Sequence, residues 1–374
     1  MPGKKLRVLV VDDTIVYRSC VSDILNEIPE VELVGVAHNG QIALAKVASL
    51  APDLLTLDIE MPVMNGLEVL AQLRKHHPQV GAIMLSTLTS DGSDMTMKAL
   101  ELGAFDFILK PQAGSLHENK RRIKEKLQPL LIAYGRSRFA AKLGGTPAFS
   151  KPIRPAPRPV ATTTASAKTA VTGQAAFSGG KRQPSEIVTI GISTGGPNAL
   201  GQMLPMLPGN LGVPVLIVQH MPPVFTKSLA ASLDKKCALT IKEAEEGETI
   251  KANIVYIAPG GKQMKLVADA GGTHRRIRIT NDPPENSCRP SADYMFRSIA
   301  DYYVGRTTAV IMTGMGSDGT KGLEILKNKG AYVIAQDEAT CVIFGMPKAP
   351  IDGGLVDCIA PLEKIANEIV KTLR

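Results

Sequence analysis

Two blocks of this chain alternate short apolar runs with stretches of helical periodicity. In the first block the apolar runs cover residues 7–11, 54–57, 82–85 and 105–109, and the helical stretches cover 15–28, 42–50, 67–73 and 95–102. In the second block the apolar runs cover 187–192, 213–218, 254–258, 309–312 and 331–335, the helical stretches cover 199–207, 225–234, 292–304 and 321–329, and a hairpin is expected at 264–280. Strand and helix alternation of this kind predicts two α/β domains, each a doubly wound parallel sheet.

The segment between these blocks has a different composition. Residues 135–183 are rich in Pro, Ala, Thr and Gly and carry nine basic residues and no acidic one. Such a segment cannot bury enough apolar surface to offset its chain entropy, so we expect a flexible tether that reaches ~40 Å. An alternative role for this basic tract is contact with an acidic partner or a membrane surface. The expected domains are therefore residues 1–130, a linker at 131–184, and residues 185–374.

Composition excludes several classes of protein. The net charge of +8 is smaller than the positive charge of the linker alone, and no basic stripe interleaved with aromatics occurs elsewhere, so we expect no nucleic-acid partner. The five Cys form no C-x-x-C pair, which favours reduced thiols over disulfides or a zinc site. We find no signal peptide and no apolar run of ~18 residues, and therefore expect a cytoplasmic protein without membrane insertion, monomeric by default.

Acidic residues stand at the ends of two strands expected in the first block. Asp12 and Asp13 follow the first apolar run and Asp58 follows the next. Because the carboxyl ends of parallel strands share one edge, these carboxylates should meet there and hold Mg²⁺ through oxygen ligands. A carboxylate beside that ion can attack a phosphoryl group. Lys110 would then offset the charge that the phosphoryl group adds, and a hydroxyl at Ser86 or Thr87 could bind a phosphoryl oxygen.

The second block begins with IVTIGISTGGPN, residues 187–198. Ser193 lies between the apolar run and a Gly-Gly-Pro that can begin a helix, a turn that exposes a nucleophile. Gly195 and Gly196 would let a carbonyl approach the backbone, and the helix would offer free N–H groups. A phosphate-binding or purely structural turn accounts for this stretch equally well. A base and an orienting acid elsewhere would favour the nucleophile.

Only two histidines, His220 and His274, lie in the second block. His220 follows the apolar run VPVLIVQ and so should reach the same edge as Ser193, whereas His274 lies in a basic hairpin. We favour His220 as the general base.

The acid has four candidates, Asp282, Asp293, Asp318 and Asp337. Asp318 is preferred because the segment MTGMGSDG follows an apolar run directly, whereas Asp293 is expected in the first turn of a helix. His220 would then take the proton of Ser193, with Asp318 fixing the imidazole tautomer. The order Ser, His, Asp differs from that of α/β-hydrolases.

The first block resembles the receiver domain of bacterial two-component signalling. The resemblance covers roughly residues 5–125 through VLVVDD, DLLTLDIEMPVMNG, AIMLST and FDFILKP. It implies a flavodoxin-like fold with Asp58 as phosphoacceptor. It also implies Asp12 and Asp13 as the acidic metal-binding pair, Glu60 lending a backbone carbonyl to Mg²⁺, Ser86 (less favourably Thr87) as the switch hydroxyl, and Lys110 as the family lysine.

The second block resembles the catalytic domain of the chemotaxis response regulator protein-glutamate methylesterase family. The resemblance covers about residues 185–373 through GISTGGP, VQHMPP, YIAPGGKQM, CRPSADYMF and MTGMGSDG. It implies a Rossmann-like domain with the triad Ser193, His220 and Asp318, the Met315 backbone in the oxyanion hole, and Thr194 orienting the site. No cofactor is implied for this domain.

The two resemblances together imply a function. The implied reaction is hydrolysis of glutamate γ-methyl esters, and deamidation of glutamines, on the cytoplasmic helices of methyl-accepting chemoreceptors. The implied control is an unphosphorylated receiver that covers the active site until a chemotaxis histidine kinase phosphorylates it. The alternative from another class is a receiver-controlled module whose second domain binds a nucleotide or phosphate through its Gly-rich turns.

Overall fold

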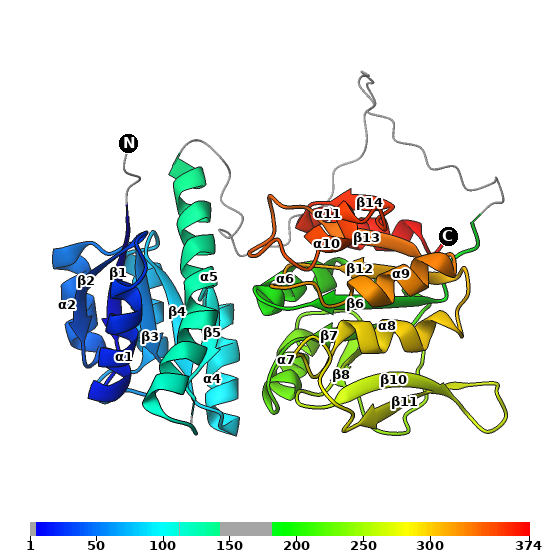
Figure 1. Ribbon diagram of the computed structural model, residues 1–374, viewed down its shortest axis with the longest axis horizontal. Coiled ribbons are helices and arrows are strands. Elements are labelled where there is room, and N and C mark those ends of the chain that lie inside the picture. The colour runs from blue at the N-terminus through cyan, green and yellow to red at the C-terminus, as the bar shows by residue number, and fades with distance from the viewer. Residues whose placement is uncertain (1–4, 112, 143–181) are drawn as a thin grey trace, which may run out of the picture.

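The computed structural model describes residues 5–111, 113–142 and 182–374. These residues form two α/β units side by side, joined in sequence after α5 (Leu116–Lys142) (Figure 1). In both units a parallel sheet is covered by helices on its two faces, as the sequence predicted. No helix of the described residues is long and apolar enough to cross a membrane.

The N-terminal sheet has the strand order β2-β1-β3-β4-β5, with every pairing parallel. This is the flavodoxin-like order, in which ligands bind at the carboxyl ends of the strands. Its strands are β1 (Leu6–Val11), β2 (Val31–Ala37), β3 (Leu54–Asp58), β4 (Gly81–Ser86) and β5 (Asp106–Leu109).

Three of the four helices between these strands begin at a side-chain cap. Asn65 forms a reciprocal cap with Glu68, because its side chain accepts from the Glu68 N–H at 3.0 Å and its own N–H donates to the Glu68 carboxylate at 2.8 Å. Asn39 and Thr89 cap α2 and α4 with a single hydrogen bond each, accepted from the N–H of Ile42 and of Gly92. The helices are α1 (Ile15–Asn26), α2 (Gly40–Leu50), α3 (Gly66–His76) and α4 (Ser90–Glu101).

The boundary that the sequence placed at residue 130 falls inside α5, which continues to Lys142. The first residues of the predicted linker, 131–142, are therefore helical. Arg138 explains this extension, because its guanidinium lies 2.8 Å from the Asp53 carboxylate and ties the last turns of α5 to the sheet. Composition could not reveal a pairing partner so distant in sequence. The rest of the predicted tether falls mainly on residues 143–181, outside the described residues.

The C-terminal sheet has the order β14-β13-β12-β6-β7-β9-β8, again all parallel. From β6 the chain adds β7 on one side and then the edge strand β8, and β9 lies between these two. The chain then returns to pair β12 with the other side of β6. Strand order therefore reverses between β6 and β12, which is where open sheets bind ligands. The strands are β6 (Ile187–Ile192), β7 (Val215–Gln219), β8 (Thr240–Glu243), β9 (Ile254–Ile257), β12 (Thr307–Ile311), β13 (Tyr332–Gln336) and β14 (Cys358–Ala360).

A separate antiparallel hairpin and seven helical segments complete the described part of this unit. The hairpin is β10 (Gln263–Ala268) with β11 (Arg275–Thr280), and it begins one residue before the range 264–280 that the sequence predicted. The helical segments are α6 (Gly196–Met203), the 3-10 turn η1 (Leu204–Met206), α7 (Phe225–Asp234), α8 (Ala292–Ala300), α9 (Thr320–Asn328), α10 (Lys348–Asp352) and α11 (Leu362–Lys371).

Strands β2, β8 and β14 were missed. Strands were predicted from compact apolar runs. Strand β8 has the sequence TIKE with one buried residue, and β14 has only three residues, so neither contains such a run. Strand β2 includes exposed positions at the edge of its sheet. Edge strands need less apolar surface than central strands, so their pattern is weak.

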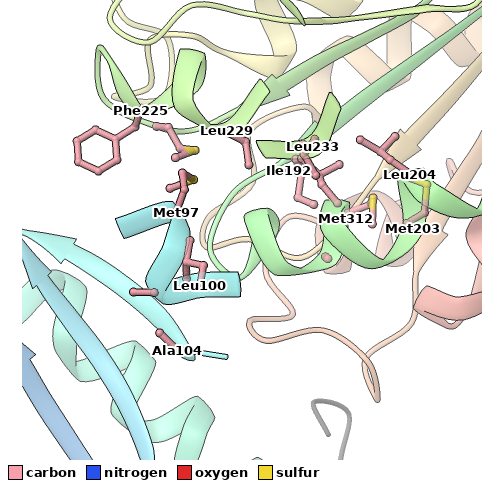
Figure 2. Close-up of a cluster of buried hydrophobic side chains, with 14 of the residues drawn as sticks. Met97, Leu100, Ala104, Ile192, Met203, Leu204, Phe225, Leu229, Leu233 and Met312 are labelled. Atoms are coloured by element: carbon pink, nitrogen blue, oxygen red, sulfur yellow. The ribbon is translucent and has the colours of Figure 1, made fainter. Parts of the chain in front are cut away.

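The two units share one continuous apolar core at their junction. Met97 and Leu100 on α4 face Phe225 and Leu229 on α7 (Figure 2). Phe107 on β5 stacks on Phe225 with ring centroids 5.1 Å apart. The receiver-like unit therefore packs on α7 through α4 and β5.

Polar contacts border this apolar junction. Ser228 on α7 accepts or donates a hydrogen bond with Ser93 at 2.8 Å and donates to Asp94 at 2.6 Å. Lys236, just beyond α7, pairs with Glu101 at 2.7 Å. The junction thus combines an apolar centre with a polar rim, the usual anatomy of a specific interface.

Candidate active site

Ser193 lies at the point where the strand order of the C-terminal sheet reverses. It follows β6 directly, and its N–H donates to the carbonyl of Thr313 after β12 at 2.9 Å. A Cβ on Gly314 would lie 2.7 Å from the Ser193 Cβ, so only glycine allows the two turns to approach this closely. The Ser193 side chain is partly exposed. Both turns are therefore held together around an accessible hydroxyl.

His220 and Asp318 meet beside this turn. His220 follows β7, and its N–H donates to the Ile192 carbonyl at 3.1 Å, which fixes the histidine next to the end of β6. Its ring Nε2 lies 2.8 Å from Oδ2 of Asp318. The sequence paired these two residues from their positions after strands, and the structure places them in direct contact.

The Asp318 carboxylate is saturated with hydrogen-bond donors. Besides His220, it accepts from the Ser291 hydroxyl at 2.8 Å and the Asn286 amide at 2.9 Å. The N–H groups of Ala292 and Asp293 also donate to it, at 2.6 and 3.3 Å. These two groups form the first turn of α8, whose dipole favours negative charge at this end. Asp318 is thereby held as an anion in a buried position.

These contacts shift the pKa values of both Asp318 and His220. Burial alone would raise the pKa of Asp318, but hydrogen bonds from His220, Asn286 and Ser291 outweigh it and lower the pKa to about 2. Burial alone would lower the pKa of His220, but its hydrogen bonds to Asp318 and Cys288 raise the pKa to about 9. The pair therefore favours a charged imidazolium on an ionised carboxylate.

The contact between Ser193 and His220 is not made in this structure. The Ser193 hydroxyl has no hydrogen-bond partner among the described residues, and the second ring nitrogen of His220, Nδ1, lies 3.6 Å from the Cys288 thiol. Because Nε2 is used by Asp318, Nδ1 is the nitrogen left to receive a proton. Catalytic hydrogen bonds are often long or misaligned before substrate binds.

Several backbone N–H groups lie in the turns around Ser193. The N–H groups of Thr194 and Met315 donate to no other described residue, so both are available to an anionic oxygen. The N–H of Gly195 instead donates to Oδ2 of Asp106 on β5, at 2.8 Å. A carboxylate of the N-terminal unit thus occupies a donor two residues from Ser193.

The other candidates of the sequence lie outside this arrangement. His274 is an exposed residue of the hairpin, and Asp282 is an exposed acceptor of the Tyr294 hydroxyl. Asp337 accepts from the N–H and hydroxyl of Thr340 within its own loop. Asp293 is in the first turn of α8, as predicted, where it accepts from Gly322 at 2.6 Å.

The carboxylates at the edge of the N-terminal sheet also converge. Asp12, Asp13 and Asp58 have carboxylate oxygens within 4.8 Å of one another, and this hard-oxygen set suits Mg²⁺. Lys110 lies between two of them, 2.8 Å from Asp12 and 2.7 Å from Asp58. Burial, with the charge of Asp12 and against that of Lys110, raises the pKa of Asp58 to about 7.

The two hydroxyls beside this site differ in orientation. Ser86 is buried, and its Oγ accepts from the Thr96 hydroxyl on α4 at 2.8 Å. Thr87 is half-buried and lies 3.5 Å from the Glu60 carboxylate, which is exposed. Ser86 ends the strand beside β3 and is therefore the hydroxyl of the two that contacts α4.

Several residues of these sites were not found from the sequence. Asn286 bridges Asp293 and Asp318 at 2.8 and 2.9 Å, and Cys288 faces His220. Both lie in the loop before α8, which carries no strand or helix pattern. Ser291 had a detectable signal, because a serine three residues before Tyr294 begins a helical stretch as an N-cap.

The comparisons with known proteins agree with both halves of this description. The C-terminal unit matches the family model described as CheB methylesterase over residues 188–369, and the N-terminal unit matches the response regulator receiver domain over residues 8–120. A Desulfotalea psychrophila protein named protein-glutamate methylesterase/protein-glutamine glutaminase is 60% identical over 374 residues, 99% of each chain. The chain belongs to the protein-glutamate methylesterase/protein-glutamine glutaminase family.

A further relative and two solved structures are also similar to this chain. The Geobacillus kaustophilus protein-glutamate methylesterase/protein-glutamine glutaminase is 42% identical over 371 residues, again 99% of each chain. The Thermotoga maritima CheB methylesterase catalytic domain is 46% identical with a TM-score of 0.49, covering 50% of this chain and 98% of that one. The response regulator domain of T. maritima CheB is 39% identical with a TM-score of 0.33, covering 36% and 98%. The resemblance predicted from the motifs is confirmed.

Proposed function

We propose that this member of the family is a phosphorylation-activated protein-glutamate methylesterase, and also a glutaminase, that acts on chemoreceptors. The observation that carries the proposal is the His220–Asp318 pair, held by five donors on the carboxylate and placed beside Ser193 at the strand-order reversal. An ionised, immobilised acid next to an imidazole is what a serine hydrolase needs to position its base.

The first half of the reaction forms an acyl-enzyme. Nδ1 of neutral His220 takes the Ser193 proton while Oγ attacks the γ-carbonyl carbon of the substrate. The resulting oxyanion is stabilised by the free N–H groups of Met315 and Thr194, and each such donor contributes about 10²- to 10³-fold in rate. Collapse of the tetrahedral intermediate expels the alkoxide, which leaves as methanol with the proton from the imidazolium.

The second half returns the enzyme to its starting state. Water gives a proton to Nδ1 and attacks the acyl carbon, and Ser193 leaves with that proton as glutamate forms. A glutamine side chain follows the same path, except that ammonia leaves in place of methanol. Asp318 stays ionised throughout because its five donors all favour the charged form.

The receiver restrains this site in the docked arrangement. The Asp106 carboxylate accepts a hydrogen bond from the Gly195 N–H. The Asn198 side chain of α6 donates to the carbonyls of Ala104 and Phe105 at 3.0 and 3.1 Å. With the apolar contacts between α4 and α7, these bonds hold the receiver against the nucleophile turn. Release of the receiver would free Gly195 and open the approach to Ser193.

Phosphorylation of Asp58 would reach this junction through Ser86. The Ser86 hydroxyl is bonded to Thr96 on α4, and the same helix carries Ser93 and Met97 at the junction. A phosphoryl group on Asp58 offers strong acceptors to the Ser86 hydroxyl and to Lys110. Turning Ser86 toward it breaks the bond to Thr96, which loosens α4 against α7.

Bound Mg²⁺ would supply positive charge for the phosphoryl oxygens at this site. Asp12, Asp13 and Asp58 are the side chains that would hold it, and the Glu60 carbonyl is proposed as a further ligand. Lys110 already neutralises part of the acidic charge. We propose a chemotaxis histidine kinase as the phosphodonor and the cytoplasmic helices of methyl-accepting receptors as substrate, which places the enzyme in the cytoplasm.

Methanol release from methylated receptor tests the proposal. The Ser193→Ala variant should release none above the uncatalysed rate, while its folding, followed by thermal unfolding, stays that of the wild type. A module that binds nucleotide or phosphate without catalysis would keep its binding in this variant. Undiminished methanol release from a folded Ser193→Ala protein would overturn the esterase assignment.

A further inference from the structure

The base of the proposed triad lies beside a thiol that the reaction does not use. Ligand atoms of His220, Cys288 and Asp318 all lie within 4.8 Å of one another. Cys288 is half-buried in the loop before α8, and its Sγ is 3.6 Å from Nδ1 of His220. An imidazole nitrogen and a thiol on one small, accessible cluster are the ligand types that a borderline-soft cation selects.

The hydrogen bonds fix which ring nitrogen is free. Asp318 is held as an anion by donors from Ser291, Asn286 and the first turn of α8. It therefore accepts a hydrogen bond from the Nε2–H of His220. In the neutral imidazole, Nδ1 then carries the lone pair, and that lone pair faces Cys288. Metal-bound histidines commonly donate their other N–H to a carboxylate in this way. Asp318 is therefore already in the position of an outer-shell partner.

The separation of the two inner ligands also fits a specific ion. Zn²⁺ binds imidazole nitrogen at about 2.0–2.1 Å and thiolate sulfur at about 2.3 Å, and a tetrahedral angle between these bonds places N and S about 3.6 Å apart. The observed distance between Nδ1 and Sγ is 3.6 Å. The separation of the two atoms therefore matches that of two ligands of one zinc ion.

We propose that Zn²⁺ binds between His220 Nδ1 and Cys288 Sγ and reversibly inhibits the enzyme. On binding, the thiol proton and the Nδ1 proton of the imidazolium pass to solvent, the thiolate and Nδ1 each donate an electron pair to the ion, and water fills the remaining positions. The inhibition rests on the proposed function, because the ion takes the lone pair that the Ser193 proton requires. The binding itself does not.

Spectroscopy of the full-length protein tests the site without reference to activity. Co²⁺ replaces Zn²⁺ as the probe, in excess Mg²⁺ so that the hard-oxygen site of Asp12, Asp13 and Asp58 is occupied. The wild type should show a thiolate-to-cobalt charge-transfer band that Zn²⁺ displaces. Cys288→Ser and Cys288→Ala should lose it. Cys237→Ser is the matched control, since Cys237 is also half-buried but belongs to no such cluster among the described residues, and it should keep the band.

Zinc titration of methanol release tests the consequence. The enzyme is first activated with a small phosphodonor, and each variant is compared with its own metal-free rate. Half-inhibition of Cys288→Ser should need at least about tenfold more Zn²⁺ than the wild type or Cys237→Ser, and a chelator should restore activity. An unchanged zinc sensitivity in Cys288→Ser, or a cobalt band that survives the substitution or never forms, would overturn the site. Loss of methanol release in every protein would count against the proposed function instead. The cobalt band would still show whether the metal site exists.

Discussion

Asp58 and Asp318 are both buried aspartates near the carboxyl ends of parallel strands, yet their surroundings give them opposite properties. Asp58 receives only the Lys110 ammonium among the described residues and lies beside two further carboxylates, and its pKa is raised to about 7. Asp318 receives five hydrogen bonds from neutral groups and an imidazole, and its pKa is lowered to about 2. Burial is similar, so the donors make the difference.

A third aspartate lies between these extremes. Asp106 is fully buried at the junction and accepts from two N–H groups, those of Phe107 and Gly195, each at 2.8 Å. Burial raises its pKa to about 6 against the effect of these two bonds. A carboxylate with few donors is left reactive or adjustable, as a phosphoacceptor must be. A carboxylate with many donors is fixed, as an orienting acid must be.

The largest expected effect comes from removing the charge of Asp318. The Asp318→Asn variant should lose about 10³- to 10⁴-fold in kcat, because the imidazole loses the acceptor that sets its tautomer. In the wild type, kcat/KM should rise with pH as His220 loses its proton, with an inflection near its raised pKa of about 9. Any residual activity of Asp318→Asn should show that inflection at lower pH, since the carboxylate no longer stabilises the imidazolium. Identical pH profiles would contradict the assigned role.

Replacing Asp58 should abolish activation by phosphorylation and leave the basal catalytic rate unchanged. A small phosphodonor with Mg²⁺ should accelerate methanol release by the wild type by about 5- to 150-fold, the usual range of coupling between two sites. Asp58→Asn should keep the basal rate and show no acceleration. Equal acceleration of both proteins would remove Asp58 from the role of phosphoacceptor.

The raised pKa of Asp58 also predicts a dependence of stability on pH. The unfolded chain loses this proton near the ordinary value of 3.8, whereas the folded chain keeps it to about 7, so the folded state binds more protons between these values. Without Mg²⁺, the free energy of unfolding should therefore fall as pH rises from about 4 to about 7, by about 4 kcal/mol. Urea unfolding of wild type and Asp58→Asn across this range measures it. The difference between the two proteins should grow with pH, and a constant difference would contradict the assignment.

The smallest expected effect concerns Asp106. Asp106→Ala removes the acceptor of the Gly195 N–H and should raise methanol release by the unphosphorylated enzyme by roughly two- to tenfold, which corresponds to about 0.5–1.5 kcal/mol for one hydrogen bond. Asp106→Asn keeps a carbonyl oxygen at this position and should give a smaller increase. Both variants should reach the wild-type rate when phosphorylated. If Ala and Asn behave alike, the hydrogen bond is not what restrains the site.

Much of the fold and the membership of the family could be predicted from the sequence. Central strands such as β6 are buried on both faces and read as continuous apolar runs, so their bounds were found to within a residue or two. His220 and Asp318 could be paired because residues that follow parallel strands meet at one edge. The edge strand β8 and the last turns of α5 were missed, because their stability comes from partners distant in sequence, such as Asp53 for Arg138.

The order of apolar runs and the residues after them determined the architecture and the chemistry of this protein, since strand periodicity and strand direction are local properties. Only the tertiary structure decided how each buried carboxylate behaves. The donors to Asp318 come from His220, the loop before α8 and the first turn of α8, and one of the two donors to Asp106 comes from the other domain. The tertiary structure also decided that Nδ1 of His220 faces Cys288, and that Asp106 of the receiver accepts a hydrogen bond from Gly195, two residues after Ser193. Charge and hydrogen bonding act over a few ångströms of space, so no pattern along the chain records them.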